Sequence, residues 1–162
     1  MAVSKLVAML FDAWDDLDRA SEGVTAEEAT AQPEGGSSFG WTLRHLAGGL
    51  DFWVNTQLRG GSQHPTFAAE HAKYEFSGAC GDWDAIAAAA RDVRRDIESY
   101  LRPLSEDDLA TIEVPGQGPY PAVSLRYMVS RSIAHTYFHI GEVATKRGLT
   151  GDFPGPLPNV IE

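Results

Sequence analysis

The sequence predicts an all-α protein folded as a four-helix bundle. Four segments carry apolar residues at steps of three and four, which is the period of a single buried helix face. Stretches rich in glycine, proline or polar residues separate these segments, and such stretches favour turns. The predicted helices span residues 4–21, 39–58, 83–101 and 124–148. Because each helix has one apolar face, the four can share one core.

The first predicted helix, 4–21, has Ser4 as an available N-cap. Its apolar stripe consists of Leu6, Leu10, Trp14 and Leu17. A short helical turn is predicted next, because Thr25 and Glu28 have the spacing of a capping box. Pro33 then ends this turn before a glycine-rich loop.

The second predicted helix, 39–58, has an apolar stripe made of Leu43, Leu46, Leu50, Trp53, Val54 and Leu58. No sustained period follows in residues 60–81, which contain a Gly-Gly pair, a proline and two histidines, so a long loop is predicted there. Asp82 is placed to cap the third helix, 83–101. Its core positions are expected at Ile86, Ala90, Val93, Ile97 and Leu101.

Another short capped turn is predicted at Ser105, and the Pro/Gly-rich connection 111–123 is expected to hold at most a brief extended piece. The fourth predicted helix begins at Ser124 and ends at Gly148, a residue type suited to the C′ position. From about residue 149 the tail is again rich in proline and glycine and is predicted to be non-helical. The prediction is a single domain over residues 1–162.

Composition excludes several classes of protein. The chain has 162 residues, of which 43% are hydrophobic, enough for one domain with a core. Its formal net charge is −10 and it has no cluster of lysine or arginine, which argues against a nucleic-acid partner. No run approaches the roughly 18 apolar residues of a membrane span, and the N-terminus lacks the features of a signal peptide. The single cysteine, Cys80, fits a reducing compartment, so a cytoplasmic location is expected.

The strongest chemical signal is the pair His135 and His139, four residues apart on the fourth helix. Positions i and i+4 lie on nearly the same side of a helix, so their two imidazoles can bind one metal ion. His45 lies at the edge of the apolar stripe of the second helix, as the pair does on the fourth, and is therefore the predicted third ligand. His64 and His71 with Glu70 are a weaker alternative, because an irregular segment fixes no geometry.

Two segments carry a family resemblance. One is WTLRHLAGGLDFW, which contains His45, and the other is AHTYFHIGE. The second segment fits a pattern of two histidines separated by three residues, followed after one further residue by a glycine. The matching residues are His135, His139 and Gly141. With four amphipathic helices, this pattern resembles the DinB/YfiT-like superfamily of metal-binding four-helix bundles. The resemblance implies one divalent metal per chain, zinc or nickel. It also implies chemistry such as S-transfer with bacillithiol, and it is compatible with a homodimer. The related isomerases that use mycothiol carry an additional domain after the bundle, so isomerisation is not expected here.

A metal held by three histidines keeps an open position for water or a thiol. Glu142 lies on the ligand face and is a candidate catalytic residue that orients a histidine or moves a proton, unless it is a solvated carboxylate. Arg131, on the same face, either binds an anionic substrate or pairs with a surface acid. Trp41, Gly48, Gly49 and Phe52 share the face of His45 and are the predicted substrate pocket.

These features predict a metal-dependent enzyme that acts on a small molecule, with transfer of a low-molecular-weight thiol as the first choice. Metal-dependent hydrolysis uses the same groups. The non-enzymatic alternative is a protein that binds a metal or a small ligand without turnover.

Overall fold

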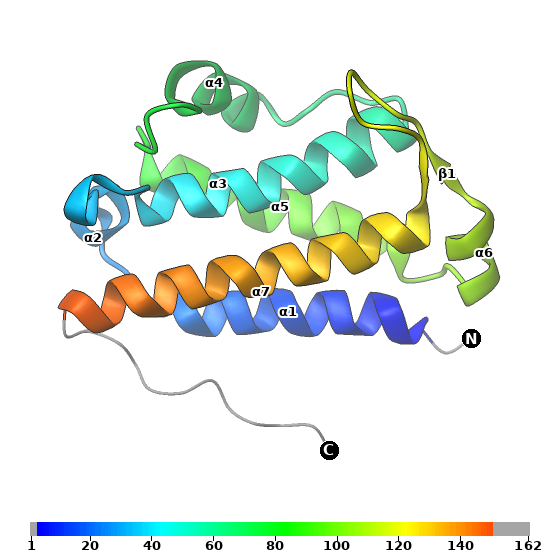
Figure 1. Ribbon diagram of the computed structural model, residues 1–162, viewed down its shortest axis with the longest axis horizontal. Helices are drawn as coiled ribbons and strands as arrows, with labels where there is room; N and C mark the ends of the chain where they lie inside the picture. The colour runs from blue at the N-terminus through cyan, green and yellow to red at the C-terminus, as the bar shows by residue number, and fades with distance from the viewer. Residues whose placement is uncertain (1–2, 151–162) are drawn as a thin grey trace.

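The computed structural model describes residues 3–150. Four long helical segments lie side by side and confirm the predicted four-helix bundle (Figure 1). They are α1 (Lys5–Ser21), α3 (Phe39–Leu50) with its continuation η2 (Asp51–Leu58), α5 (Trp83–Leu101) and α7 (Leu125–Thr150). The Ser4 hydroxyl caps α1 and the Asp82 carboxylate caps α5, as the sequence predicts.

The helices run in the order up, down, down, up (Figure 1). α1 and α7 are parallel, and Arg147 near the end of α7 donates to the backbone oxygens of Ala20 and Glu22 at the end of α1. α3 is antiparallel to α7, so that Ser37, before the start of α3, meets Lys146 near the end of α7. This arrangement places the middle of α3 opposite the middle of α7.

The parallel run of α3 and α5 requires a connection that returns along the bundle. This connection contains a helix, α4 (Pro65–Tyr74), so the prediction of an unbroken loop over 60–81 was wrong (Figure 1). His64 accepts a hydrogen bond from the Thr66 backbone as the N-cap, and Pro65 occupies the first helical position. Phe67 is the one fully buried residue of α4, and one buried position is too few to show a helical period.

The second bundle helix changes its winding at Asp51. Residues Asp51–Leu58 form a π-helix, whereas one continuous α-helix over 39–58 was predicted. The Asp51 carboxylate is buried and accepts hydrogen bonds from Asn55 Nδ2 at 2.8 Å and from the His64 backbone N–H at 2.6 Å. The wider turns alter the register of the side chains, so Val54 is buried while Trp53 and Leu58 are only partly buried.

Short elements complete the chain: α2 (Ala26–Thr30), the 3₁₀ turn η1 (Pro33–Gly35), α6 (Glu106–Thr111), and the antiparallel pair β1 (Glu113–Val114) and β2 (Val123–Ser124). The predicted capping box at Thr25 and the predicted capped turn at Ser105 are both present, and Ser105 also forms a capping box, with Asp108. α7 continues two residues past Gly148, where the sequence predicted its end. The predicted non-helical tail from residue 151 onward lies outside the described residues.

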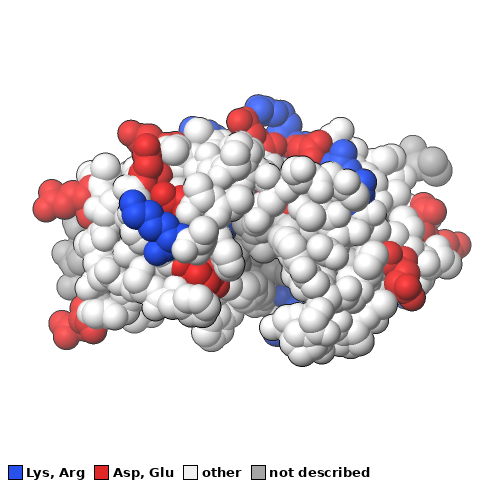
Figure 2. Space-filling view, turned by 90° about the horizontal axis from the view of Figure 1, so that it is seen from above, with Lys and Arg blue, Asp and Glu red and all other residues white. Residues whose placement is uncertain are grey.

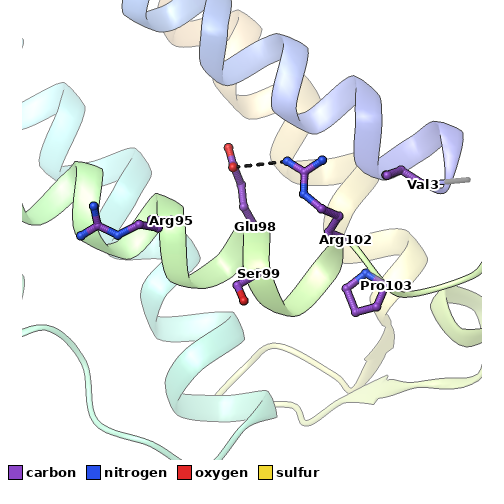
Figure 3. A pocket seen from close by; sticks show the side chains of 6 residues that line it. All are labelled: Val3, Arg95, Glu98, Ser99, Arg102 and Pro103. Atoms are coloured by element: carbon purple, nitrogen blue, oxygen red, sulfur yellow. Dashed lines mark ion pairs between the residues drawn. The ribbon is translucent and has the colours of Figure 1, made fainter. Parts of the chain in front are cut away.

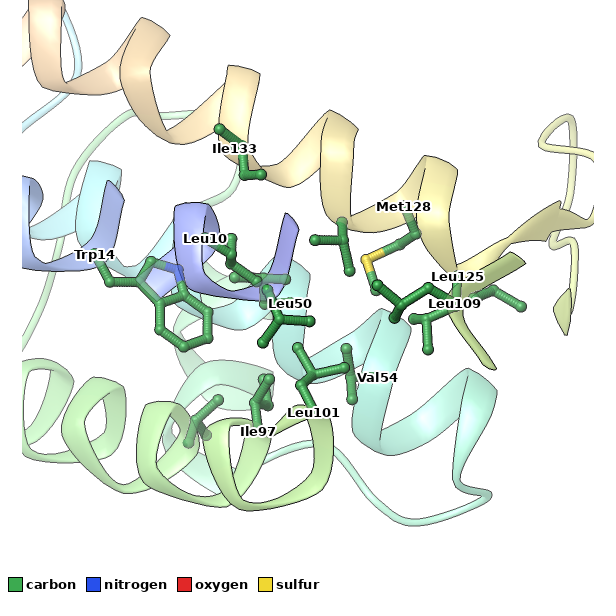
Figure 4. Close-up of a cluster of buried hydrophobic side chains, with 14 of the residues drawn as sticks. Leu10, Trp14, Leu50, Val54, Ile97, Leu101, Leu109, Leu125, Met128 and Ile133 are labelled. Carbon is green, nitrogen blue, oxygen red and sulfur yellow. The ribbon is translucent and has the colours of Figure 1, made fainter. Parts of the chain in front are cut away.

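The core lies between the four long helices (Figure 4). α5 buries Ile86, Val93, Ile97 and Leu101 at the predicted positions, whereas Ala90 is only partly buried. A larger cluster fills the half of the bundle around Leu10, Leu101 and Leu125. A smaller cluster around Leu17, Phe39 and Ile140 fills the other half. The two clusters hold α3 and α7 in fixed register, which the site between them requires.

Gly40 shows how tightly α3 packs at its N-terminal end. A Cβ atom at this position would clash with Cys80 Sγ. It would also lie 3.0 Å from Cys80 Cβ and 3.1 Å from the Ala29 backbone oxygen. We therefore expect Gly40→Ala to lower the free energy of unfolding by about 1–3 kcal/mol, measured by urea denaturation. Gly49→Ala is the matched control, since a Cβ there meets nothing within 4 Å. It should raise stability by about 0.5–1 kcal/mol, and an equal effect of both substitutions would contradict this account of Gly40.

The surface seen from the side of α4 carries scattered acidic and basic side chains, with uncharged residues between them (Figure 2). Lysine and arginine do not gather into a patch on the described part of this face. Within residues 3–150, none of the helices is both long enough and apolar enough to cross a membrane.

Candidate metal centre

The middle of α3 and the middle of α7 bring three histidines together. The Nε2 atom of His135 lies 3.2 Å from Nε2 of His45 and 3.1 Å from Nε2 of His139. One nitrogen from each ring fits within a span of 4.8 Å. Among the described residues, this is the group of three metal-binding side-chain types that converges in this way.

The two separations from His135 Nε2 match those of ligands around one ion. Zinc–imidazole bonds of about 2.0–2.1 Å at a tetrahedral centre place neighbouring nitrogens roughly 3.3 Å apart. The two measured separations are within a few tenths of an ångström of that value. These two separations are therefore compatible with binding of one divalent ion by the three rings.

The protonation states of the rings also favour a cation. Glu142 Oε2 lies 2.7 Å from His139 Nδ1, which assigns the ring hydrogen to Nδ1 and leaves a lone pair on Nε2. His135 Nε2 faces this lone pair and also His45 Nε2. One nitrogen cannot form good hydrogen bonds with both neighbours when all three rings are neutral. A metal ion would satisfy all three nitrogens at once.

Burial keeps two of these rings, His135 and His45, neutral. It lowers the pKa of His135 to about 4, with a further contribution from the charges of His139, His45 and Arg131. Burial likewise lowers the pKa of His45 below its ordinary value, together with the charge of His139. Neutral imidazoles at pH 7 are the form that binds metal.

Glu142 is held in place from three sides. Burial raises the pKa of its carboxyl group, but hydrogen bonds from Lys146, Ser37 and His139 outweigh this effect and lower the pKa to about 2. The Ser37 hydroxyl donates to Glu142 Oε1 at 2.6 Å, and Lys146 Nζ forms an ion pair with the same oxygen. A fixed, ionised carboxylate on Nδ1 orients the His139 ring and makes Nε2 more basic.

The ring of His45 is supported by Trp41. The two rings stack with centroids 4.8 Å apart and planes 6° from parallel. Trp41 Nε1 donates to the Glu75 backbone oxygen at 3.2 Å, and the Arg44 guanidinium lies over the indole at 5.4 Å. Arg44 Nη2 in turn binds Glu75 Oε2 at 2.6 Å. Trp41 is thus close to the triad, where its contacts orient a ligand ring.

The other predicted site residues occupy different positions. Arg131 is exposed, forms no ion pair with another described residue, and is close enough to affect the pKa of His135. A Cβ on Gly49 would meet open space, whereas one on Gly48 would meet Phe67 of α4 at 3.4 Å. Gly48 therefore lies under α4 and does not border an open pocket. Phe52 is on the π-helix and packs edge-on against Trp53.

The remaining candidate residues form caps, ion pairs or packing contacts. His64 caps α4, and His71 lies 3.1 Å from Glu75, so these histidines do not form a second cluster. Cys80 packs against Gly40, and burial raises the pKa of its thiol. A raised pKa makes this thiol a poor nucleophile at neutral pH.

Comparison with known proteins identifies the family. A family model described as the DinB superfamily matches residues 9–143. The chain belongs to the DinB superfamily. No curated protein matches the sequence.

Solved structures share the DinB fold at low sequence identity. A conserved protein from Enterococcus faecalis superposes with a TM-score of 0.69 at 18% identity, covering 93% of this chain and 99% of that one. YfiT from Bacillus subtilis superposes with a TM-score of 0.63 at 16% identity, covering 91% and 86%. YfiT is described as "a probable metal-dependent hydrolase with an unusual four-helix bundle topology". At these identities the likeness establishes the fold alone.

Several residues that hold the candidate metal ligands of this DinB protein in place were not predicted from the sequence. Lys146 follows Glu142 by four residues, so the helical i,i+4 ion-pair pattern could have identified it. Ser37 and Glu75 come from separate segments and carry no comparable signal. Phe138, 71% exposed, lies beside the His139 ring with centroids 5.1 Å apart and was also not predicted.

The lowered histidine pKa values predict a pH dependence for the metal-free protein. Between pH 4 and 6.5 the unfolded chain protonates His135, whereas the folded chain does not. The free energy of unfolding should therefore rise with pH across this window and level off above 6.5. Urea unfolding of chelator-treated protein measures the slope, and His135→Gln should make it smaller. Equal slopes for the two proteins would show that burial of this ring does not affect stability.

Proposed function

We propose that the chain is a metal-dependent enzyme that activates a low-molecular-weight thiol and transfers it to a small electrophile. The observation that carries this proposal is the convergence of three imidazole Nε2 atoms on one point, with His135 Nε2 3.1–3.2 Å from its two neighbours. A divalent ion, zinc or nickel, suits these ligands. Three protein ligands leave an open coordination position, which is typical of catalytic sites.

The open position would supply the nucleophile. A bound divalent ion lowers the pKa of a coordinated thiol or water, so that either can react near neutral pH. The chain's own role is to keep His135 and His45 neutral, to orient His139 through Glu142, and to support His45 through Trp41. These contacts fix the ligand rings before the metal binds.

The state of the nearby carboxylates favours a thiol over water. Despite its burial, Glu142 has a pKa of about 2, because it accepts hydrogen bonds from Lys146, Ser37 and His139, and it is therefore a weak base. Glu75 is likewise occupied by Arg44 and His71. Neither carboxylate is free to accept a proton from a substrate at neutral pH. A divalent ion held by His45, His135 and His139 would acidify a coordinated thiol, whose proton would pass to bulk water, so no protein base would be needed.

The substrate is proposed to approach over the exposed side of α7. Arg131 offers a positive charge near His135 that no carboxylate of the described chain neutralises, and Phe138 offers an apolar surface beside His139. Gly49 has open space around its Cα on the opposite helix. Together they suit a small molecule with an anionic group and an apolar part.

Hydrolysis is the second candidate. YfiT, which shares this fold, is described as a probable metal-dependent hydrolase. The same open position could hold water instead of a thiol. The two reactions differ in whether turnover requires added thiol.

The test incubates zinc-loaded and nickel-loaded protein with an electrophilic probe and with a panel of esters and amides. Each reaction is run without thiol, with mycothiol and with bacillithiol. Thiol-dependent conjugation that is lost in His139→Ala supports transfer. Thiol-independent cleavage lost in the same variant indicates a hydrolase instead. No metal-dependent turnover across the panel would contradict both enzymatic proposals and favour a binding protein.

A further inference from the structure

A crevice of about 310 Å³ lies between α1, α3 and α5, on a different face of α3 from His45. Its walls are mainly apolar. They include Trp14 and Leu17 of α1, Leu46 of α3, and Trp83, Ala87 and Ala90 of α5. Figure 4 shows Trp14, Leu50 and Ile97, three residues of this lining, where they join the main core.

The crevice exists because the facing surfaces of α1 and α5 do not close on each other. α5 presents Ala87 and Ala90 here, and alanine is too small to fill the space that leucine would occupy. The seam between the two helices is bridged instead by Arg94, whose guanidinium binds Asp15 at 2.5 Å and Asp18 at 2.5 Å. This bridge covers part of the apolar space and leaves the rest accessible.

The rim of the crevice has one cation without a hydrogen-bonded partner. Three charged residues line it: Asp18, Arg91 and Arg94. Arg94 and Asp18 pair with each other. Arg91 is exposed, lies near enough to Asp18 for their charges to interact, and forms no hydrogen bond or close ion pair with another residue of the described chain. The rim therefore offers one available guanidinium, which prefers a carboxylate.

We infer that this crevice binds a small molecule with an apolar body and one carboxylate, and that Arg91 recognises the carboxylate. A space of about 310 Å³ is near the lower end of the sizes of ligand sites. At the packing density of protein interiors it holds about a dozen non-hydrogen atoms. A medium-chain fatty acid such as octanoate has this size and this chemistry.

Neither a protein partner nor the neighbouring depression explains these features as well. Interface cores are depleted in charged residues, whereas Arg91, Arg94 and Asp18 ring this opening. The other depression, of about 690 Å³, lies farther along α5 and is lined by Arg95, Glu98 and Arg102 (Figure 3). Its arginines already face carboxylates, Arg102 with Glu98 at 3.6 Å and Arg95 with Asp92 at 2.5 Å.

The test titrates octanoate, 1-octanol and octylamine into the zinc-loaded protein and follows binding by calorimetry and by amide chemical shifts. Octanoate should bind and shift the amides around Ala87 and Ala90. Ala90→Leu fills the crevice and should weaken octanoate at least about 10-fold, because the added side chain takes the place of the ligand. Ala88→Leu is the matched control, since Ala88 is exposed on the same helix, and it should change affinity less than about 2-fold.

The charge is tested separately. Arg91→Gln should weaken octanoate about 5- to 10-fold and leave 1-octanol unchanged. Octanoate binding that Ala90→Leu does not alter, or shifts confined to His135 and His139, would place the ligand on the metal and overturn the inference. Absence of binding at millimolar octanoate would also overturn it, as would octylamine binding more tightly than octanoate.

Discussion

Replacement of His135 by alanine is expected to abolish metal binding. His135 Nε2 is the central atom of the triad, with one neighbouring nitrogen at 3.2 Å and the other at 3.1 Å. Its removal leaves two imidazoles, which are too few to retain a divalent ion against dilution. The affinity should fall by more than the roughly 10–100-fold that loss of an outer-shell partner costs. Elemental analysis of protein purified without a nickel column measures the metal content.

His64→Ala serves as the control for this experiment. His64 caps α4 and lies outside the triad, so its variant should keep the metal content of the unaltered protein. Circular dichroism should give helical spectra for both variants, which separates metal loss from unfolding. Unchanged metal content in the His135 variant would show that these three histidines are not the binding site.

Replacement of Glu142 by alanine is expected to lower the metal affinity by about 10–100-fold. The carboxylate fixes the His139 tautomer through a 2.7 Å contact to Nδ1, and its loss frees the ring to rotate and to change tautomer. The buried end of Lys146 also loses its ion-pair partner. Competition with a chromogenic chelator measures the dissociation constant.

Glu142→Gln separates the two roles of this carboxylate. The glutamine oxygen can still accept the Nδ1 hydrogen, but it carries no charge, so the loss should be smaller than for alanine. Arg95→Gln is the surface control: Arg95 is exposed on α5 and pairs with Asp92, so the variant should retain full affinity. Unaltered affinity in the Glu142→Ala variant would show that Glu142 does not orient His139.

The helices of the bundle were predictable because each buries one face. α5 was predicted with its structural boundaries, since Asp82 caps it and five apolar positions repeat along it. α4 was missed because one buried residue, Phe67, gives no period. The π-helix after Asp51 was missed because apolar spacing does not report tertiary contacts such as the hydrogen bond that the His64 backbone N–H donates to the buried Asp51 carboxylate. The order and direction in which the helices pack also cannot be predicted from the spacing of apolar residues.

The candidate metal triad was predictable because two of its three histidines lie on one helix, where sequence spacing fixes their separation. His135 and His139 are four residues apart on a single helix, and His45 lies at the same kind of stripe edge on α3. The residues that hold the triad in place were harder to predict from the sequence. Ser37 reaches Glu142 across 105 positions of chain, and Trp41 is fixed by the backbone of Glu75, which follows a helix that was not predicted. Such contacts depend on the packed structure.

X-ray absorption at the zinc edge tests the central claim, one divalent ion on His45, His135 and His139 with an open position. The zinc-loaded protein should show imidazole scattering from three rings and one further light atom at about 2.0–2.1 Å. A thiol added in excess should replace that light atom by sulfur at about 2.3 Å. A first shell without imidazole scattering, or a shell closed by a fourth protein ligand that no added molecule displaces, would contradict the account.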